Sequence, residues 1–265
     1  NLGSTTCNLR YVKNTIFNKM LGVILALLKG RSLQQGIYAN KLVVKKINKI
    51  LLSNAYKVTV IHLFRNYSNE IKFSSKYVHF DLCDCQSYNY LQVLDSKHVS
   101  YVKKLIYKYE LAKTIKVEKL IAANDKWLIS FINRHDSTYF AEKYLTIRSI
   151  YILPNYFNID KGARYYPGNK FAIVGNFKSY HNKQMLKIIC TSPVFGEIKY
   201  QLLIIGQIGI LLTMYLKLKG LKVVRNPRSV IDEISQCSFG LSFLEFNSGF
   251  QTKLIDYANA SLLPI

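Results

Sequence analysis

The segment 247–258 carries residue types suited to binding a nucleotide, and it reads NSGFQTKLIDYA. Lys253 and Asp256 are three residues apart, so on a helix they lie on a common side. A lysine in the first turns of a helix that follows a glycine suits a diphosphate, and an acid one turn later suits a ribose diol. The alternative is a surface ion pair, worth a few tenths of a kcal/mol. The core-facing side would hold Phe250, Leu254, Ile255 and Ala258.

The second half of the chain alternates short apolar runs with helical patterns, which predicts a parallel sheet with helical crossovers. Expected strands are 171–175, 200–206, 221–224, 239–244 and 262–265. Helices are expected over 183–190, up to about 219, from Ser229, and from about 248 to 260. Ligands of such sheets bind beyond the carboxyl ends of the strands. That rule selects Asn176 and Lys178 after the first strand and Glu245 after the fourth.

The first half is less regular but is also predicted to be α/β. Helices are expected over 11–28, 41–53, 88–116 and 125–133, and strands over 57–63, 77–82, 119–123 and 149–153. Arg65 and Asp84 follow strand ends, so both are expected to face a ligand. The alternative for Asp84 is an ordinary loop or cap residue. His62 is expected to pack in the core.

Composition and charge limit the classes of function that are compatible with the sequence. Of the 265 residues 49% are apolar, enough for a sizeable core, and Lys plus Arg exceed Asp plus Glu by 37 to 15. The net charge of +22 favours an anionic partner, either nucleic acid, a membrane surface or a phosphate-bearing substrate, unless coding bias explains it. Five scattered cysteines indicate free thiols. Cys83 and Cys85 lack the second pair typical of zinc sites, so no metal is expected.

Residues 154–169 are rich in Asn, Tyr, Gly and Pro, as a linker would be. We therefore predict an N-terminal domain over 1–155, a linker over 156–169 and a C-terminal domain over 170–265, facing each other across a cleft. The apolar runs 20–28 and 202–216 are too short to span a membrane. The protein is expected to be soluble and cytoplasmic, with peripheral attachment at the inner face of the cell membrane as a further option.

Several short motifs, in order, resemble one known family. They are VGNF at 174–177, LIIG at 203–206 and SGFQTKLIDYANASLLPI at 248–265, with IHLFR at 61–65 and FDLCDCQS at 80–87 in the first half. The chain resembles the family-4-type (group 1) retaining glycosyltransferases. Within that family it is similar to the bacterial branch involved in capsule and exopolysaccharide synthesis. That family has two Rossmann-like domains in the GT-B arrangement. Its members extend further at both ends, so the chain is expected to be a truncated form.

The resemblance implies roles for individual residues. The backbone from Gly249 through Phe250 and Gln251 to Thr252 would hold the donor diphosphate, and Lys253 would add charge. Asp256 stands where the family has a ribose-binding Glu, and Ser248 stands where it often has another Glu, for which Glu245 could substitute. Asn176 ends the Val-Gly-Asn strand, and Lys178 would be a second cation. In the first half, Asp84 would be an acceptor-side acid or base.

The function implied is transfer of a sugar from a nucleotide-sugar donor to a lipid-linked or growing polysaccharide acceptor, without a cofactor or metal. Two other functions are compatible with the sequence. The charge and the 13% aromatic content would suit a nucleic-acid-binding module, although no RNA- or DNA-binding motif is present. A catalytically inactive remnant of a glycosyltransferase would share the fold and bind no donor.

Overall fold

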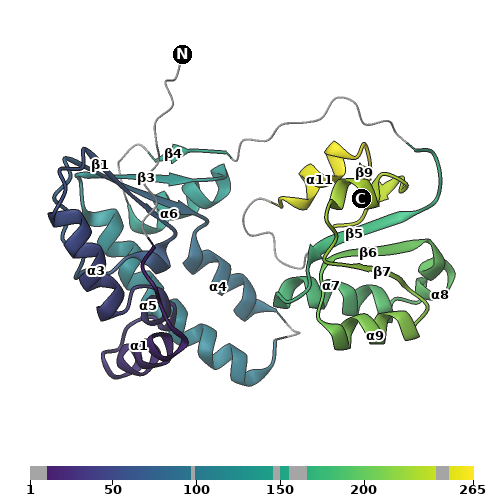
Figure 1. Ribbon diagram of the computed structural model, residues 1–265, viewed down its shortest axis with the longest axis horizontal. Helices are drawn as coiled ribbons and strands as arrows, with labels where there is room; N and C mark the ends of the chain where they lie inside the picture. Colours follow the sequence, from purple (N-terminus) through teal and green to yellow (C-terminus); the bar gives the residue numbers. More distant parts are fainter. Residues whose placement is uncertain (1–10, 97–98, 146–149, 155–165, 243–250) are drawn as a thin grey trace, which may run out of the picture. The chain divides into compact units, whose positions relative to one another are not determined.

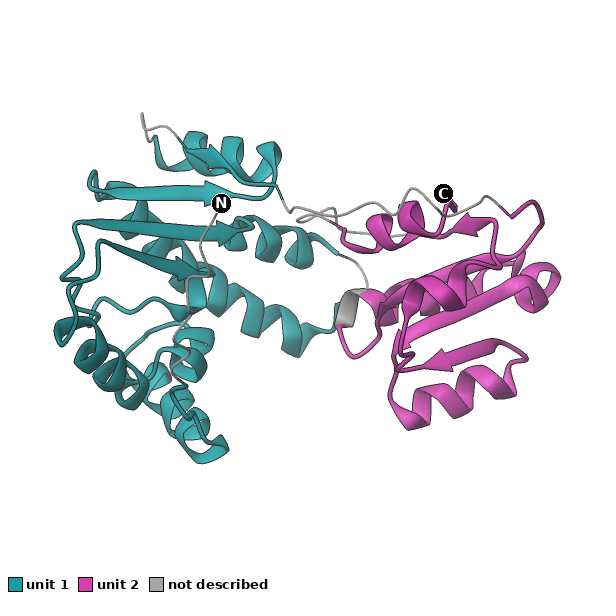
Figure 2. Cartoon of the chain, turned by 45° about the horizontal axis from the view of Figure 1, so that its top comes forward, with its two compact units in different colours: residues 1–154 teal, residues 155–265 magenta. Residues whose placement is uncertain are grey.

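The computed structural model describes residues 11–96, 99–145, 150–154, 166–242 and 251–265. The chain divides into two compact units, residues 1–154 and 155–265 (Figure 2). Each unit is built on its own parallel sheet, of four strands in the first and five in the second, which confirms the α/β class. The predicted linker lies mostly among residues 155–165, outside the described residues. No helix in the described part of the chain is long and apolar enough to cross a membrane.

The first unit begins with three helices and continues into a sheet of order β1-β2-β3-β4 (Figure 1). The helices are α1 (Ile16–Leu28), α2 (Leu33–Tyr38) and α3 (Lys41–Leu52). The sheet and its connections are β1 (Val58–His62), a 3-10 turn (Phe64–Asn66), β2 (Tyr77–Cys83), α4 (Gln86–Asp95), α5 (Tyr101–Ala123), β3 (Trp127–Phe131), α6 (Arg134–Tyr144) and β4 (Tyr151–Ile152).

The prediction was wrong between residues 119 and 133. The expected strand 119–123 is the last part of helix α5, and the expected helix 125–133 contains strand β3. Buried residues recur along α5 at Glu110, Thr114, Glu118 and Ile121. This spacing of three or four residues is that of one helix face. The run WLISF of β3 supplies the aromatic and β-branched residues of a buried strand.

The second unit has the strand order β7-β6-β5-β8-β9, with every pair parallel. Counted along the unit, that order is 3-2-1-4-5, which is the order of doubly wound sheets. Its elements are β5 (Phe171–Asn176), α7 (Tyr180–Thr191), α8 (Phe195–Ile198), a 3-10 turn (Lys199–Gln201), β6 (Leu202–Gln207), α9 (Ile210–Leu218), β7 (Lys222–Arg225), α10 (Val230–Ile234), β8 (Phe239–Gly240), α11 (Lys253–Asn259) and β9 (Leu263–Pro264).

The strand order reverses between β5 and β8, where the ladder contains only two residue pairs. Beyond them the hydroxyl of Tyr257 bridges the strands. It accepts from the backbone N–H of Val174 at 3.0 Å and donates to the carbonyl of Leu241 at 2.9 Å. A Cβ atom at Gly240 would lie 2.4 Å from the Tyr257 ring, so only glycine fits there. The buried tyrosine thereby fixes α11 against the point of strand reversal.

Candidate functional site

Lys253 is a buried lysine at the start of α11. It is only 8% exposed, and its Nζ atom lies 3.8 Å from the Sδ atom of Met185 on α7. The two ion pairs formed within the described residues do not include it, so the alternative of a surface ion pair with Asp256 is wrong. Burial lowers the pKa of the Lys253 ammonium. A cation held in this way gains from an anion placed beside it.

Asp256 is half-buried one turn later, and burial raises the pKa of its carboxyl. Gln251 lies just before the helix, where its Oε1 atom accepts from the hydroxyl of Ser242. That bond links the beginning of α11 to the residues that follow β8. Thr252 is exposed.

Asn176 is the last residue of β5, Lys178 follows the strand, and both are exposed. The Asn176 side chain accepts from the Lys178 backbone N–H at 3.1 Å, and Asn182 Nδ2 donates to the Asn176 carbonyl at 3.0 Å. These bonds shape the loop at the carboxyl end of β5 and leave the Lys178 ammonium at the surface. The predicted donor residues Glu245, Ser248, Gly249 and Phe250 lie outside the described residues.

In the first unit, Asp84 follows the carboxyl end of β2. Its Oδ1 atom is buried and has no hydrogen-bond partner among the described residues. Burial, and then the charge of Asp136, raise the pKa of the Asp84 carboxyl to about 6. Arg65 lies in the 3-10 turn after β1, with its guanidinium 4.8 Å from the centroid of the Tyr38 ring. Burial raises the pKa of the Cys83 thiol, the charge of Asp84 raises it further, and the charge of Arg65 lowers it.

Two neighbouring carboxylates already accept hydrogen bonds from backbone N–H groups. Asp136 accepts from the N–H of Cys85, and Glu118 from the N–H of Ser87, each at 3.0 Å. Glu118 also accepts from the hydroxyl of Tyr144 at 2.7 Å. Both carboxylates therefore cap the start of α4, which is closed to an anionic ligand. The sequence analysis missed these caps, although the helical spacing of Glu118 with other buried α5 residues is a signal for its burial.

Glu110, two turns earlier on α5, caps the start of α2 in the same way. Its two carboxylate oxygens accept from the Ser32 hydroxyl at 2.7 Å and the Leu33 N–H at 2.6 Å. One helix thus supplies buried caps to two others, and neither glutamate is available for chemistry.

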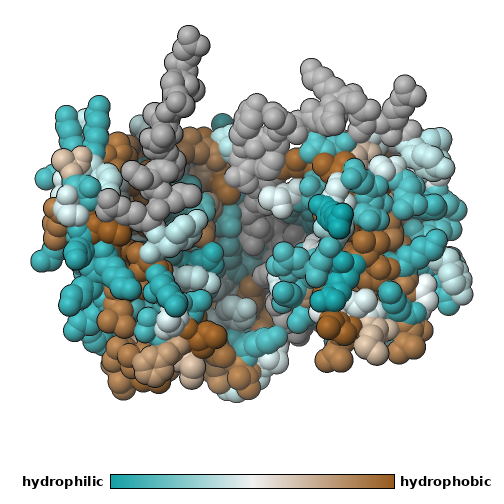
Figure 3. All heavy atoms as spheres, in the orientation of Figure 1, coloured by the Kyte–Doolittle hydropathy of each residue, from teal (hydrophilic) through white to brown (hydrophobic). Residues whose placement is uncertain are grey.

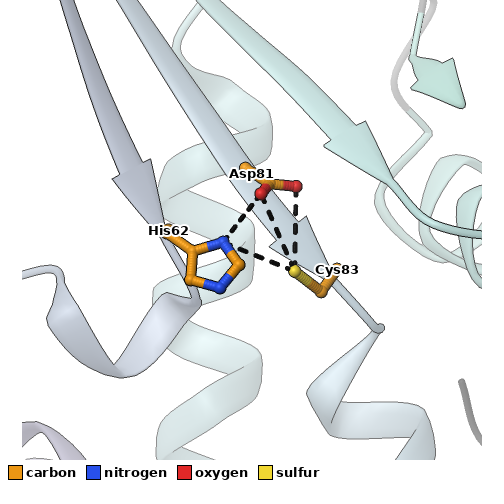
Figure 4. Close-up of side chains that lie close together, drawn as sticks. All are labelled: His62, Asp81 and Cys83. Carbon is orange, nitrogen blue, oxygen red and sulfur yellow. Dashed lines mark hydrogen bonds and ion pairs between the residues drawn. The ribbon is translucent and has the colours of Figure 1, made fainter. Parts of the chain in front are cut away.

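A second group of side chains lies at the carboxyl ends of β1 and β2. His62 Nδ1 is 2.7 Å from Asp81 Oδ2 and 3.6 Å from Cys83 Sγ (Figure 4). The side chain of His62 is 61% exposed, so the prediction that it packs in the core was wrong. The reason is its place at the end of an edge strand, beside the acid of the neighbouring strand. Burial and the adjacent acids raise the pKa of the Cys83 thiol to about 12.

No protein-family model matches the chain, and no curated protein matches it significantly. The function therefore has to be inferred from the residues and geometry of the two units.

Proposed function

We propose that this chain is a glycosyltransferase of the GT-B type that moves a sugar from a nucleotide-sugar donor to a lipid-linked or growing polysaccharide acceptor. The observation that carries the proposal is Lys253, buried without an anionic partner among the described residues. It lies next to the strand reversal of a doubly wound sheet, where such sheets bind their ligands. A diphosphate is the anion that this position suits.

In the proposed reaction the bond between the sugar and the diphosphate breaks, and negative charge develops on the leaving phosphate. Lys253 would stabilise that charge from a water-poor position, where electrostatic stabilisation is strongest. Asp256 would accept hydrogen bonds from the ribose hydroxyls, and Asn176 and Lys178 would border the donor from the loop after β5. This scheme needs no metal. The resemblance to the family implies retention of configuration.

The first unit would bind the acceptor. An acid with a pKa of about 6 can exchange a proton near neutral pH, so Asp84 is the residue we assign to proton transfer. Arg65, close to the same strand ends, would bind an acceptor phosphate.

Helix α1 offers a surface for attachment to an anionic membrane. It contains no acidic residue, and brown spheres gather at the lower left of the space-filling view, where α1 lies (Figures 1 and 3). Its exposed apolar residues are Ile16, Phe17, Met20, Leu21, Ile24, Leu27 and Leu28. An apolar face of this kind, in a chain of net charge +22, suits the headgroup region of an anionic lipid surface. A cytoplasmic location at the inner face of the cell membrane would follow.

The test is donor binding by Lys253→Met, measured by calorimetry with UDP, GDP and their sugar conjugates. Methionine keeps the size and apolar stem of the side chain and removes the charge. Hydrogen bonds to a charged group contribute about 1.5–3 kcal/mol, so the dissociation constant should rise roughly 10- to 150-fold. The matched control is Lys187→Met, at an exposed lysine of α7, which should bind as the wild type does. Equal affinity of Lys253→Met and wild type would contradict the donor site. A wild-type protein that bound none of these nucleotides would favour the inactive remnant.

A further inference from the structure

We propose that His62, Asp81 and Cys83 form a zinc site at the carboxyl ends of β1 and β2, with one coordination position left for an oxygen ligand. The inference is independent of the proposed function, which uses no metal, and it departs from the expectation drawn from the sequence. Imidazole nitrogen, carboxylate oxygen and thiolate sulfur are the three kinds of ligand that Zn²⁺ takes in proteins. Their atoms all lie within 4.8 Å of one another.

The distances between these atoms approach those of a tetrahedral zinc site. Bonds of about 2.3 Å to sulfur and about 2.05 Å to nitrogen or oxygen place sulfur about 3.6 Å from each of the other ligands. Cys83 Sγ is 3.6 Å from His62 Nδ1 and 3.8 Å from each Asp81 oxygen. The nitrogen–oxygen edge is shorter, at 2.7 Å, because these atoms share a hydrogen bond. Zinc binding needs this edge to open by about 0.6 Å, to the roughly 3.3 Å that separates nitrogen and oxygen ligands in a tetrahedral site.

The three groups converge on one point, and they do not form the relay of a nucleophilic triad. In a relay the histidine contacts the nucleophile with one ring nitrogen and the acid with the other. Here the same atom, Nδ1 of His62, contacts both Cys83 and Asp81 (Figure 4). The arrangement is that of ligands around a cation.

The backbone is shaped to aim Cys83 at this point. The pairing of β2 with β3 shifts register between Asp81 and Cys83, so the strand bulges there. Cys83 has a φ of 62°, and Leu63, next to His62, has a φ of 66°. Such conformations are strained for non-glycine residues and cluster at functional sites, and bulges re-aim side chains there. Two adjacent strand ends both carry this strain, and both border the cluster.

A second layer of hydrogen bonds supports the carboxylate. Ser130, which is fully buried on β3, donates to Asp81 Oδ1 at 3.2 Å. The Ser130 hydroxyl is in turn 2.8 Å from His79 Nε2. Carboxylates that ligate metals are held by such outer partners. With a carboxylate and a thiolate, the site would neutralise the charge of Zn²⁺. The exposed His62 ring shows that solvent reaches it to supply a fourth ligand.

The experiment is a zinc titration of the whole chain, stripped with EDTA and desalted, in competition with a chromophoric chelator. The variants are His62→Gln, which changes an exposed side chain and should fold normally, and Cys83→Ser. The matched controls are Cys190→Ser and His135→Gln, which remove one thiol and one imidazole elsewhere. Ser130→Ala tests the supporting layer. Cobalt(II) loading provides a spectroscopic readout, since a thiolate ligand gives a sulfur-to-cobalt charge-transfer band in the near ultraviolet.

We expect one zinc per chain in the wild type and in both controls. Loss of an outer partner costs about 10–100-fold in affinity, so Ser130→Ala should fall in that range and the two ligand variants should lose at least as much. The charge-transfer band should be absent from Cys83→Ser and present in Cys190→Ser. The proposal is overturned if His62→Gln binds zinc as tightly as wild type, or if the cobalt-loaded wild type shows no charge-transfer band. Nucleotide binding is measured separately, so failure here leaves the proposed function standing.

Discussion

Replacing Asp84 with asparagine should change how the stability of the first unit depends on pH. Burial raises the pKa of this carboxyl from 3.8 to about 6. The folded chain therefore holds the proton more tightly than the unfolded chain does. The contribution of Asp84 to the free energy of unfolding of the wild type should therefore fall as pH rises from about 4 to about 6 and then level off. Asparagine has nearly the same shape and no charge, so the variant lacks this loss.

The size of the effect follows from the two pKa values. At roughly 1.4 kcal/mol per pH unit, the interval from 3.8 to about 6 corresponds to about 3 kcal/mol. Asp84 is partly exposed, and solvent screening reduces the effect, so we expect a relative gain of about 1–2 kcal/mol for Asp84→Asn between pH 4 and pH 7. Altered packing in the variant would change its free energy of unfolding by the same amount at every pH. That constant difference cancels, because only the change in the free energy of unfolding with pH is compared.

The assay is urea unfolding at a series of pH values, followed by the fluorescence of Trp127. This is the only tryptophan in the chain, and its ring lies 4.8 Å from that of Phe80 on β2, the strand that leads to Asp84. The probe thus reports on the relevant unit. The exposed Asp125 provides the control, since Asp125→Asn should follow the wild-type curve. If the curves of Asp84→Asn and wild type run parallel across this range, the burial argument for Asp84 is refuted.

Two further predictions concern α11 and α1. Tyr257→Phe leaves one backbone N–H and one carbonyl unpaired in the core of the second unit, so it should lower the free energy of unfolding by about 1–3 kcal/mol. Urea unfolding followed by circular dichroism measures this loss, and Tyr215→Phe at a half-exposed tyrosine should show none. Phe17→Ser should weaken co-sedimentation of the protein with phosphatidylserine-containing vesicles. Its co-sedimentation with neutral phosphatidylcholine vesicles, the control, should stay unchanged. Undiminished sedimentation of the variant would exclude α1 as the attachment surface.

The sequence predicted the second unit well because its strands are short apolar runs separated by clear helical patterns. In the first unit the run LIAA before Asn124 was read as a strand, although it continues the buried face of α5. A local window could not decide this, because an apolar run of four or five residues fits either structure. The core-facing side of α11 was predicted only in part, since Leu254 does pack against the core of the second unit. Ala258 is exposed, while Tyr257 and Lys253 are buried.

The candidate sites were predictable only as positions after strand ends. Arg65, Asp84 and Lys178 do follow such ends, and Asn176 is the last residue of its strand. Parallel strands bring their carboxyl ends to one edge of the sheet. The convergence of His62, Asp81 and Cys83 could not be read from the sequence, since it depends on strand register, a bulge and a positive φ. None of these leaves a residue-type signal, and Cys83 occupies a conformation in which glycine would be expected.

Hydrogen-bond partners separate the buried charges that build the fold from those that remain for a ligand. Glu110, Glu118 and Asp136 each accept from backbone N–H groups, so their burial is compensated within the chain. Among the described residues, the Lys253 ammonium has only a thioether as its hydrogen-bond partner, and Asp84 keeps one buried oxygen without a partner. An uncompensated buried charge destabilises the fold. Lys253 and Asp84 lie at the carboxyl edges of the two sheets, where the gain from binding a ligand can offset that cost.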